Sequence, residues 1–435
     1  MKGKDENIYH RGVNAWCMYD WANSVYSTII VAAMLPPYFS EVAHAAGLTK
    51  TQASSIWGYI TSLAMLSVAL LAPILGALAD YTGTKKKYLF VFFLIGIIFT
   101  SLLVLIDLGE WVLCLMFFAI SGIGFAGANV FYDSLLPHVA KHDEIDQISA
   151  KGYALGYFGG GLLLAINLLM FTKHYWFGIP TESWGVRLSF LSAGIWWAIF
   201  SIPVFCYVKE PLRPKDYVPT KNPLKVSFRN LINTFREIRK YKYVVIFLIA
   251  YLLYVDGIGT IIKMATIYGT EIGISMSHLV GALLLTQFVG VPFTLLFGWF
   301  AKKIGTKNVI ISALSIYVLI SIGGYLMTKP IHFWILATMV GLVQGGSQAL
   351  SRALFASIIP KAKSAEFFGF LNISSKFGGI VGPLIFGIVG QLSGTSRLGI
   401  ISLIIFFVSG ICMLLFLNEK EGKKIAQEEN IKAGY

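Results

Sequence analysis

The feature that most constrains this chain is a series of twelve long apolar segments separated by short polar ones. They lie at residues 15–41, 54–79, 88–106, 111–136, 152–171 and 187–207, and, after a polar stretch, at 243–269, 278–300, 308–327, 332–359, 367–391 and 398–417. Each is about long enough to cross a bilayer as a helix, which satisfies its own backbone hydrogen bonds there. Only 13% of the residues are charged, about half the share in an average soluble domain. We therefore expect an all-α integral membrane protein with twelve transmembrane helices.

The positive charge of the chain marks one side of this membrane. Lys and Arg outnumber Asp and Glu by 35 to 22, which gives a net charge of +13. The two termini and the loops on their side hold 27 of the 35 basic residues, and loops rich in Lys and Arg face the cytoplasm. We expect a multi-pass protein of the cell membrane, in contact with lipid and with both termini cytoplasmic. This distribution argues against nucleic acid as a partner.

A polar segment divides the apolar segments into two sets of six. It carries ten basic residues, and its four prolines fall in its first half. We interpret it as a cytoplasmic basic linker whose second half could lie on the membrane as an amphipathic helix. The predicted domains are an N-terminal six-helix half (1–207), this linker (208–242), a C-terminal six-helix half (243–418) and a cytoplasmic tail (419–435).

Short motifs recur in the two halves at nearly one spacing. Tyr132–Pro137 ends the fourth segment and resembles Phe355–Pro360, which lies 223 residues later. A glycine-containing basic loop after the second segment recurs 222 residues later. Its matched positions are Gly76, Asp80, Gly83 and Lys85 in the first copy and Gly298, Lys302, Gly305 and Lys307 in the second. We infer a duplicated six-helix unit whose copies share one orientation, as in transporters that hold their substrate near the midplane between two halves.

The loop G-x-L-x-D-x-x-G-x-K-K that begins at Gly76 resembles the signature loop of the major facilitator superfamily (MFS). The resemblance implies two pseudo-symmetric six-helix bundles and a gate at this loop. Its glycines would permit a tight turn and close helix contact, and Asp80 would interact with a helix terminus of the other half to help hold the cytoplasmic side shut. The second copy carries Lys302 in place of the acid, so the resemblance does not imply an equivalent gate in the second half. With two intramembrane charges included, the predicted gating residues are Gly76, Asp80, Gly83, Lys85, Lys86, Asp133 and Lys376.

The first apolar segment carries a narrower motif. Its sequence Tyr19-Asp20-Trp21-Ala22-Asn23-Ser24, followed by Pro36-Pro37, resembles an MFS branch that includes fungal vacuolar effluxers linked to autophagy and their bacterial relatives. The resemblance implies export of amino acids for the fungal members. For this chain we expect a secondary active transporter that exports a small polar solute, an amino acid or a similar organic solute, by rocker-switch alternating access. A facilitator or proton-coupled carrier of organic anions or other small solutes is the alternative.

Ionisable side chains inside apolar segments are costly, so they are candidates for function. The chain has three such acids and three such bases, and five of the six lie on the first and fourth segments of a half. These segments line the central cavity in the superfamily. Helical spacing groups the charges with polar neighbours on one face. The predicted substrate-binding or coupling residues are Asp20, Asn23, Ser27, Asn129, Asp256, Thr260, Lys263, Gln344, Gln348 and Arg352.

Two of these residues leave alternatives open. Arg352 could present its donors to an anionic or zwitterionic solute, or it could pair with Asp20 or Asp133 across the cavity as a gate. A buried carboxylate such as Asp20 can take up a proton near neutral pH. Protons could therefore be the coupling ion.

The chain carries no motif typical of an enzyme or of an ATP-driven pump. It has no P-loop of the GxxxxGK[ST] type. His138 and His142 have the i, i+4 spacing that can bind zinc, but the glutamate of HExxH is missing, and we interpret them as part of a solvated helix face. A membrane-embedded enzyme is thus a distant alternative, and we expect no cofactor, no metal and a monomeric protein.

Overall fold

The computed structural model describes residues 2–48, 50–211, 241–274, 276–393 and 396–433, together with Val226, Arg229 and Ile232. Within these ranges all regular secondary structure is helical. The first half contains α1 (Lys2–Val25), the π-helix η1 (Tyr26–Met34), α2 (Leu35–Ala45), α3 (Lys50–Thr82), α4 (Lys85–Leu102), η2 (Leu103–Leu105), α5 (Trp111–Val139), α6 (Ile145–Thr172), η3 (His174–Phe177) and α7 (Glu182–Tyr207). The second contains α9 (Lys242–Glu271), α10 (Met276–Ile304), α11 (Thr306–Tyr325), α12 (Pro330–Ile358), η5 (Lys361–Lys363), α13 (Ser364–Ser393), α14 (Ser396–Ser402), α15 (Ile404–Leu415) and α16 (Glu419–Ala433).

Each of the twelve predicted segments coincides with a helix or with a run of consecutive helices. Ten stretches of the described residues are long and apolar enough to cross a membrane, and Leu66–Thr82 adds a shorter apolar helix. In the first segment α1, η1 and α2 join into one run, Glu6–Ala45. The π-helical turns directly precede Pro36 and Pro37, which lack the N–H groups that would continue an α-helical ladder. The predicted all-α membrane fold is confirmed.

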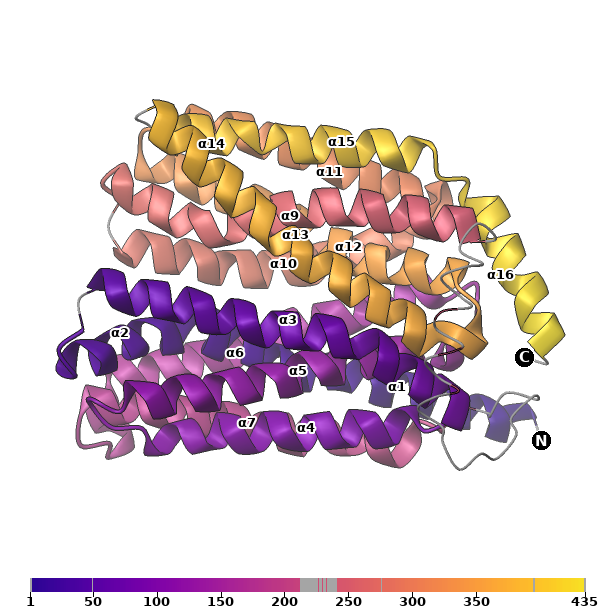
Figure 1. Ribbon diagram of the computed structural model, residues 1–435, viewed down its shortest axis with the longest axis horizontal. Coiled ribbons are helices and arrows are strands. Elements are labelled where there is room, and N and C mark those ends of the chain that lie inside the picture. Colours follow the sequence, from indigo (N-terminus) through magenta and orange to yellow (C-terminus); the bar gives the residue numbers. More distant parts are fainter. Residues whose placement is uncertain are drawn as a thin grey trace.

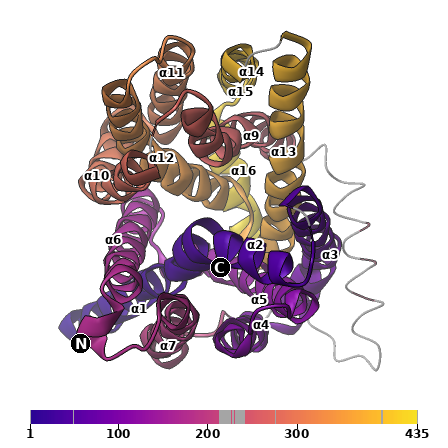
Figure 2. The same cartoon turned by 90° about the vertical axis from the view of Figure 1, so that its left-hand side faces the viewer.

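The helices form two bundles side by side (Figure 1). We call α1–α7 the N-half and α9–α15 the C-half. Across the boundary α6 packs against α10 and α12, while α13 packs against α3 and α5. Both termini lie at one end of the bundles, the termini end, and Figure 2 is viewed from the opposite end. The predicted interfacial helix of the linker falls almost entirely outside the described residues.

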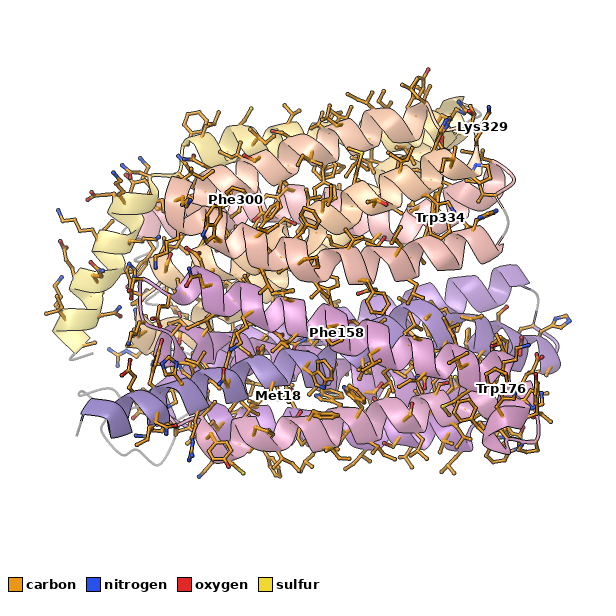
Figure 3. All side chains as sticks on the ribbon, turned by 180° about the vertical axis from the view of Figure 1, so that it is seen from behind. Met18, Phe158, Trp176, Phe300, Lys329 and Trp334 are labelled. Atoms are coloured by element: carbon orange, nitrogen blue, oxygen red, sulfur yellow. The ribbon has the colours of Figure 1, made fainter. Side chains whose placement is uncertain are left out.

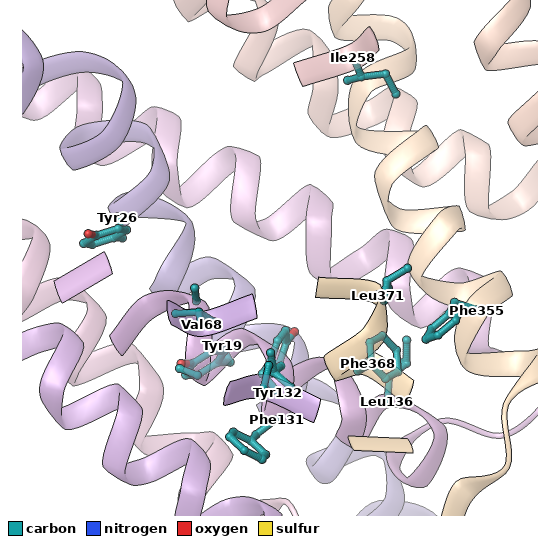
Figure 4. Close-up of a cluster of buried hydrophobic side chains, with 14 of the residues drawn as sticks. Tyr19, Tyr26, Val68, Phe131, Tyr132, Leu136, Ile258, Phe355, Phe368 and Leu371 are labelled. Atoms are coloured by element: carbon teal, nitrogen blue, oxygen red, sulfur yellow. The ribbon is translucent and has the colours of Figure 1, made fainter. Parts of the chain in front are cut away.

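The apolar core runs across the boundary between the halves. Leu136 of α5 lies beside Phe368 and Leu371 of α13 and near Phe355 of α12 (Figure 4), and all four belong to one cluster of buried residues. In this cluster apolar side chains of the two halves pack directly on each other. The two halves therefore meet over a packed surface in this structure.

Large side chains cover the outer surface of the bundles (Figure 3). Trp176, which is 67% exposed, lies at the end opposite the termini, and so does Trp334. Phe300 is exposed nearer the termini end. Aromatic side chains near both ends of apolar bundles are typical of proteins that sit between two membrane–water interfaces.

Candidate functional site

A cavity of about 370 Å³ lies between the halves, toward the end opposite the termini. Its walls include Pro37 of α2, Tyr268 of α9 and Phe333 of α12, which all stand near the helix ends that point away from the termini. The described residues that line the cavity are mostly apolar and carry no charge. Its polar lining comes from Thr28, Tyr268, Thr286, Gln287, Ser321 and Gln344. A few hydrogen-bonding groups in an apolar wall are typical of a site for a small molecule.

The inner face of α12 leads from the cavity to the termini end. Gln344 lines the cavity. One turn farther on, Gln348 accepts a hydrogen bond of 3.2 Å from the Tyr157 hydroxyl of α6. One turn beyond that, Arg352 is 5% exposed. The predicted stripe on α12 thus runs from the solute-sized space into the closed contact between the halves.

Arg352 holds the halves together through buried ion pairs. Its Nη2 lies 2.8 Å from Oδ2 of Asp20 on α1, and its Nη1 lies 3.1 Å from Oδ1 of Asp133 on α5. Its Nε donates to the Ser149 hydroxyl of α6 at 2.9 Å, and Nη2 also donates to the Ser149 carbonyl. A buried charge needs such partners because desolvation is otherwise costly. Arg352 is therefore paired with both acids, and the three groups together carry one excess negative charge.

Aromatic rings enclose the guanidinium on two sides. The Arg352 Cζ lies 4.7 Å from the Trp16 ring centroid and 4.3 Å from that of Tyr153, which favours a cation–π interaction. Trp16 donates its ring N–H to the Tyr132 carbonyl at 3.1 Å, which fixes the ring in place. Gly152 also lies against the guanidinium, because a Cβ there would lie 3.1 Å from Nη2 of Arg352.

A second set of bonds between the halves lies at the signature loop. The Asp80 carboxylate accepts hydrogen bonds from the backbone N–H groups of Ala365 at 3.2 Å and Glu366 at 2.8 Å. These residues form the first turn of α13, whose unpaired N–H groups and helix dipole favour an anion. Gly76 lies against the same turn, since a Cβ on it would come within 2.9 Å of the Glu366 nitrogen. Gly83 makes the turn after α3 with a φ of +63°, which favours glycine.

The two lysines of this loop reach different partners. Lys85 is 2% exposed and pairs with Asp80 at 2.8 Å, and it donates to the Ser364 hydroxyl of α13. Lys86 stays within the N-half, where its Nζ donates to the carbonyls of Phe205 and Val208 at the end of α7. Lys85 therefore belongs to the contact between the halves, and Lys86 does not.

The interpretation of His138 as part of a solvated helix face is wrong. Its Nε2 lies 2.9 Å from the Lys85 Nζ and 3.2 Å from the Ser364 hydroxyl. The last turn of α5 points His138 at the first turn of α13 rather than at solvent, because Leu136 before it packs beside Phe368 of α13. The spacing of the two histidines gave no sign of this partner from a distant segment.

The remaining predicted residues whose side chains the structure describes do not line the cavity. Asp256 accepts the backbone N–H of Gly382 at 2.7 Å, just before Pro383 in α13, and Thr260 donates to the Asp256 carbonyl. Asn23 donates to Asn129 at 2.6 Å within the N-half. Ser27 is exposed, and its hydroxyl donates to the Ser24 carbonyl. The side chains of Lys263 and Lys376 lie outside the described residues.

Several residues of the site were not among the predicted ones. Thr28, Thr286 and Gln287 line the cavity, and a single polar residue in an apolar segment is too common to single out. Tyr153 and Tyr157 face α12 one turn apart. Their i, i+4 spacing beside Gly152 and Gly156 was the available signal, because aromatic residues next to small ones mark a face that packs closely on another helix.

Comparisons with known proteins agree with this architecture. The chain is 39% identical over 420 residues to the MFS-type transporter YxiO of Bacillus subtilis. This match covers 96% of this chain and 97% of that protein. It is 24% identical to autophagy-related protein 22 of Saccharomyces cerevisiae over 86% of this chain and 80% of that one.

Solved structures of low sequence identity share the fold. The human organic anion transporter MFSD10 superposes with a TM-score of 0.70 at 15% identity and covers 93% of this chain and 99% of its own. The MFS transporter FucP in the outward conformation has a TM-score of 0.69 at 12% identity and covers 94% of this chain and 98% of its own.

The fold is that of solved MFS transporters, and the 39% identical relative is an MFS-type transporter, so the chain is an MFS transporter. The model of the Atg22-like vacuole effluxer family matches residues 9–427. The chain therefore belongs to this family.

Proposed function

We propose that this transporter exports a small polar solute, an amino acid or a similar organic solute, by alternating access between its halves. The observation that carries the proposal is the position of the cavity. It lies toward the end opposite the termini, while Arg352 and Asp80 bond across the halves at the termini end. With the basic loops on the cytoplasmic side, this is a state closed to the cytoplasm.

The chemistry of the cavity supports a solute that is recognised by hydrogen bonds and apolar contact. The amides of Gln287 and Gln344 can each donate and accept, and the hydroxyls of Thr28 and Thr286 lie in the same wall. The apolar remainder of the wall fits the carbon skeleton of an organic solute. A volume of about 370 Å³ is within the range of small-molecule sites.

The same proposal makes the proton the coupling ion and assigns its binding to Asp20 and Asp133, which pair with Arg352 on the termini side of the cavity. Asp20 and Asp133 share the single cation Arg352, so one added proton would neutralise the buried group. Neutralisation weakens one of the ion pairs that hold the termini end shut. Proton binding and opening toward the cytoplasm would then be linked.

Flux through vesicles reconstituted with the purified protein tests this function. Vesicles loaded with labelled amino acids are compared with and without a pH gradient, for the unchanged protein and for Gln344→Leu, Asp20→Asn and Arg352→Gln. We expect Gln344→Leu to raise the solute concentration needed for half-maximal flux, and Asp20→Asn to abolish the response to the gradient. Ser312→Ala is the control, because Ser312 is exposed and bonds only to its own helix.

The outcomes separate the candidate functions. Unchanged flux in all three site variants would refute the site. Movement of organic anions with no movement of amino acids would favour the alternative carrier, and failure to move any solute would refute the transport proposal.

A further inference from the structure

His138 is a titratable ring in the contact at the start of α13, and the transport proposal makes no use of it. An ammonium group has three N–H donors and no acceptor. The Lys85 Nζ meets three acceptors: Oδ1 of Asp80 at 2.8 Å, the Ser364 hydroxyl, and Nε2 of His138 at 2.9 Å. The His138 Nε2 must therefore offer its lone pair, so the ring is neutral in this closed state.

The groups around the ring make this neutral form necessary. The charges that act on His138 are Lys85 of α4 and Lys361 of η5, and His138 also hydrogen-bonds to the Lys361 backbone. Both of these side chains are cations. The Asp80 carboxylate is engaged by Lys85 and by the first turn of α13. An imidazolium at this position would face two positive charges.

We propose that His138 is a regulatory binding site for a proton, and that its protonation releases the contact between Lys85, Asp80 and α13. A proton on Nε2 removes the acceptor of Lys85 and places a second cation about 3 Å from the ammonium, where repulsion is strong in a buried site. Lys85 then moves away from Ser364. Since Ser364 donates to the Ser134 carbonyl of α5 at 3.0 Å, the bonds between α13 and the N-half loosen together.

The consequence is a transporter whose termini end opens more readily in acid. This response is distinct from coupling at Asp20 and Asp133, because it acts through the contact at the start of α13 and requires no solute. Histidine is suited to this role since its charge changes between about pH 5 and 8.

A native cysteine reports the opening. Cys17 of α1 is fully buried next to Trp16, whose ring lies 4.7 Å from the Arg352 Cζ of the other half, and the Cys17 Sγ lies 3.6 Å from the Ile148 carbonyl of α6. In a reporter protein in which Cys114, Cys206 and Cys412 are replaced by Ala, the rate of maleimide labelling of Cys17 measures exposure of the closed contact. The labelling rate also depends on the thiolate fraction, so the reporter protein and the same protein with His138→Gln are compared at each pH. Gln keeps an acceptor for Lys85 but does not titrate.

We expect the ratio of the two labelling rates, the reporter over His138→Gln, to rise about tenfold between about pH 7.5 and 5.5, the factor given by one unit of pKa difference. A ratio that stays constant overturns the proposal. Lys85→Gln provides the second test, because it keeps His138 but removes the cation that a proton would oppose. The pH response of the labelling rate should be smaller in Lys85→Gln than in the unchanged reporter, and an equal response in both would also overturn the proposal.

Discussion

The two copies of the signature loop close the same end of the molecule by different means. In the first copy the acid Asp80 stands at the end of α3 and binds the first turn of α13 in the other half. In the second copy Lys302 occupies the matching position and is exposed. The bond across the halves is formed instead by Asp146 of α6, whose Oδ2 accepts from the Thr306 hydroxyl of α11 at 2.8 Å. The acid thus belongs to the loop itself in the first contact and to the opposite half in the second.

The structure also shifts the alignment of the two loops by one residue. The sequence matches Lys85 with Lys307, but Lys86 is the residue that behaves like Lys307. The backbone N–H of each donates to a glutamate, Glu210 at 3.0 Å and Glu419 at 3.0 Å. The Nζ of each donates to carbonyls at the end of its half's last helix. The second turn is one residue shorter, so Thr306 holds the place of Lys85 at the start of its helix.

Of the two matching loops, the first makes the stronger contact between the halves and the second the weaker one. A charged carboxylate on two backbone N–H groups with a buried lysine beside it holds more tightly than one hydroxyl on a carboxylate. The first loop should therefore dominate closure.

The largest expected effect comes from Asp80→Asn. The change removes the anion from the first turn of α13 and leaves Lys85 buried without its counter-ion, which costs about 3 kcal/mol or more. We expect maleimide labelling of Cys17 in the reporter protein to rise about 100-fold at neutral pH. Lys302→Asn at the matching position of the second loop is the control and should leave the rate unchanged. Equal rates in both variants would contradict the role of Asp80 in holding the termini end closed.

Gly76→Ala and Gly298→Ala compare the close approaches at the two loops. A Cβ at Gly76 would lie 2.6 Å from the Ala365 carbonyl carbon and 2.9 Å from the Glu366 nitrogen, which are backbone atoms. A Cβ at Gly298 would lie 2.7 Å from the Ala150 methyl and 3.4 Å from the backbone of Gln147. Overpacking costs about 1–3 kcal/mol, and we expect the upper part of this range only for Gly76→Ala. Thermal unfolding of the purified variants measures the difference, and a larger loss for Gly298→Ala would contradict it.

The sequence predicted the helices well because each of them must be apolar over a bilayer's thickness. The predicted segment 111–136 became α5, and 332–359 became α12 with nearly the same ends. The site was less predictable, because polar residues such as Asp256 can face a neighbouring helix of their own half as readily as the cavity. Whether Arg352 would bind a solute or two acids depended on which helices meet across the halves. His138 shows the same limit, since its partners Lys85 and Ser364 lie 53 and 226 residues away.

A smaller effect is expected from Thr306→Val, which keeps the shape of the side chain and removes the single bond to Asp146. A hydrogen bond to a charged group such as this carboxylate contributes about 1.5 kcal/mol or more. We expect a rise of about tenfold in Cys17 labelling, well below that of Asp80→Asn. Thr84→Val is the matched control, because the Thr84 hydroxyl contacts Thr82 in its own half at 2.6 Å. An effect of Thr84→Val as large as that of Thr306→Val would argue against a contact specific to the second loop.

The smallest expected effect concerns Glu419 and Glu210, the glutamates that accept the backbone N–H groups of Lys307 and Lys86. Burial alone raises the pKa of Glu419, but hydrogen bonds from Lys423 of α16 and from the Lys307 backbone outweigh it, so the pKa lies below the usual range. Burial raises the pKa of Glu210 above its usual range, although the Lys86 backbone N–H opposes this. The tail helix α16 therefore supplies, through Lys423, a side-chain hydrogen bond that lowers the pKa of Glu419. The carboxylate of Glu419 stabilises the fold, whereas that of Glu210 is disfavoured in it.

The signs of the pH dependence are opposite. The contribution of Glu419 is fully present above the unfolded pKa of about 4.3 and is lost as the pH falls through its lower folded pKa. The penalty at Glu210 is present above its raised folded pKa and disappears as the pH falls toward the unfolded value. Melting temperatures between about pH 7 and 3 should therefore fall less with acid in Glu419→Gln than in the unchanged protein, and should fall more with acid in Glu210→Gln. Lys423→Gln should make the response of Glu419 resemble that of Glu210, because it removes the bond that lowers the pKa of Glu419 most. If Lys423→Gln left the acid response of the melting temperature unchanged, α16 would have no part in the difference between the two loops.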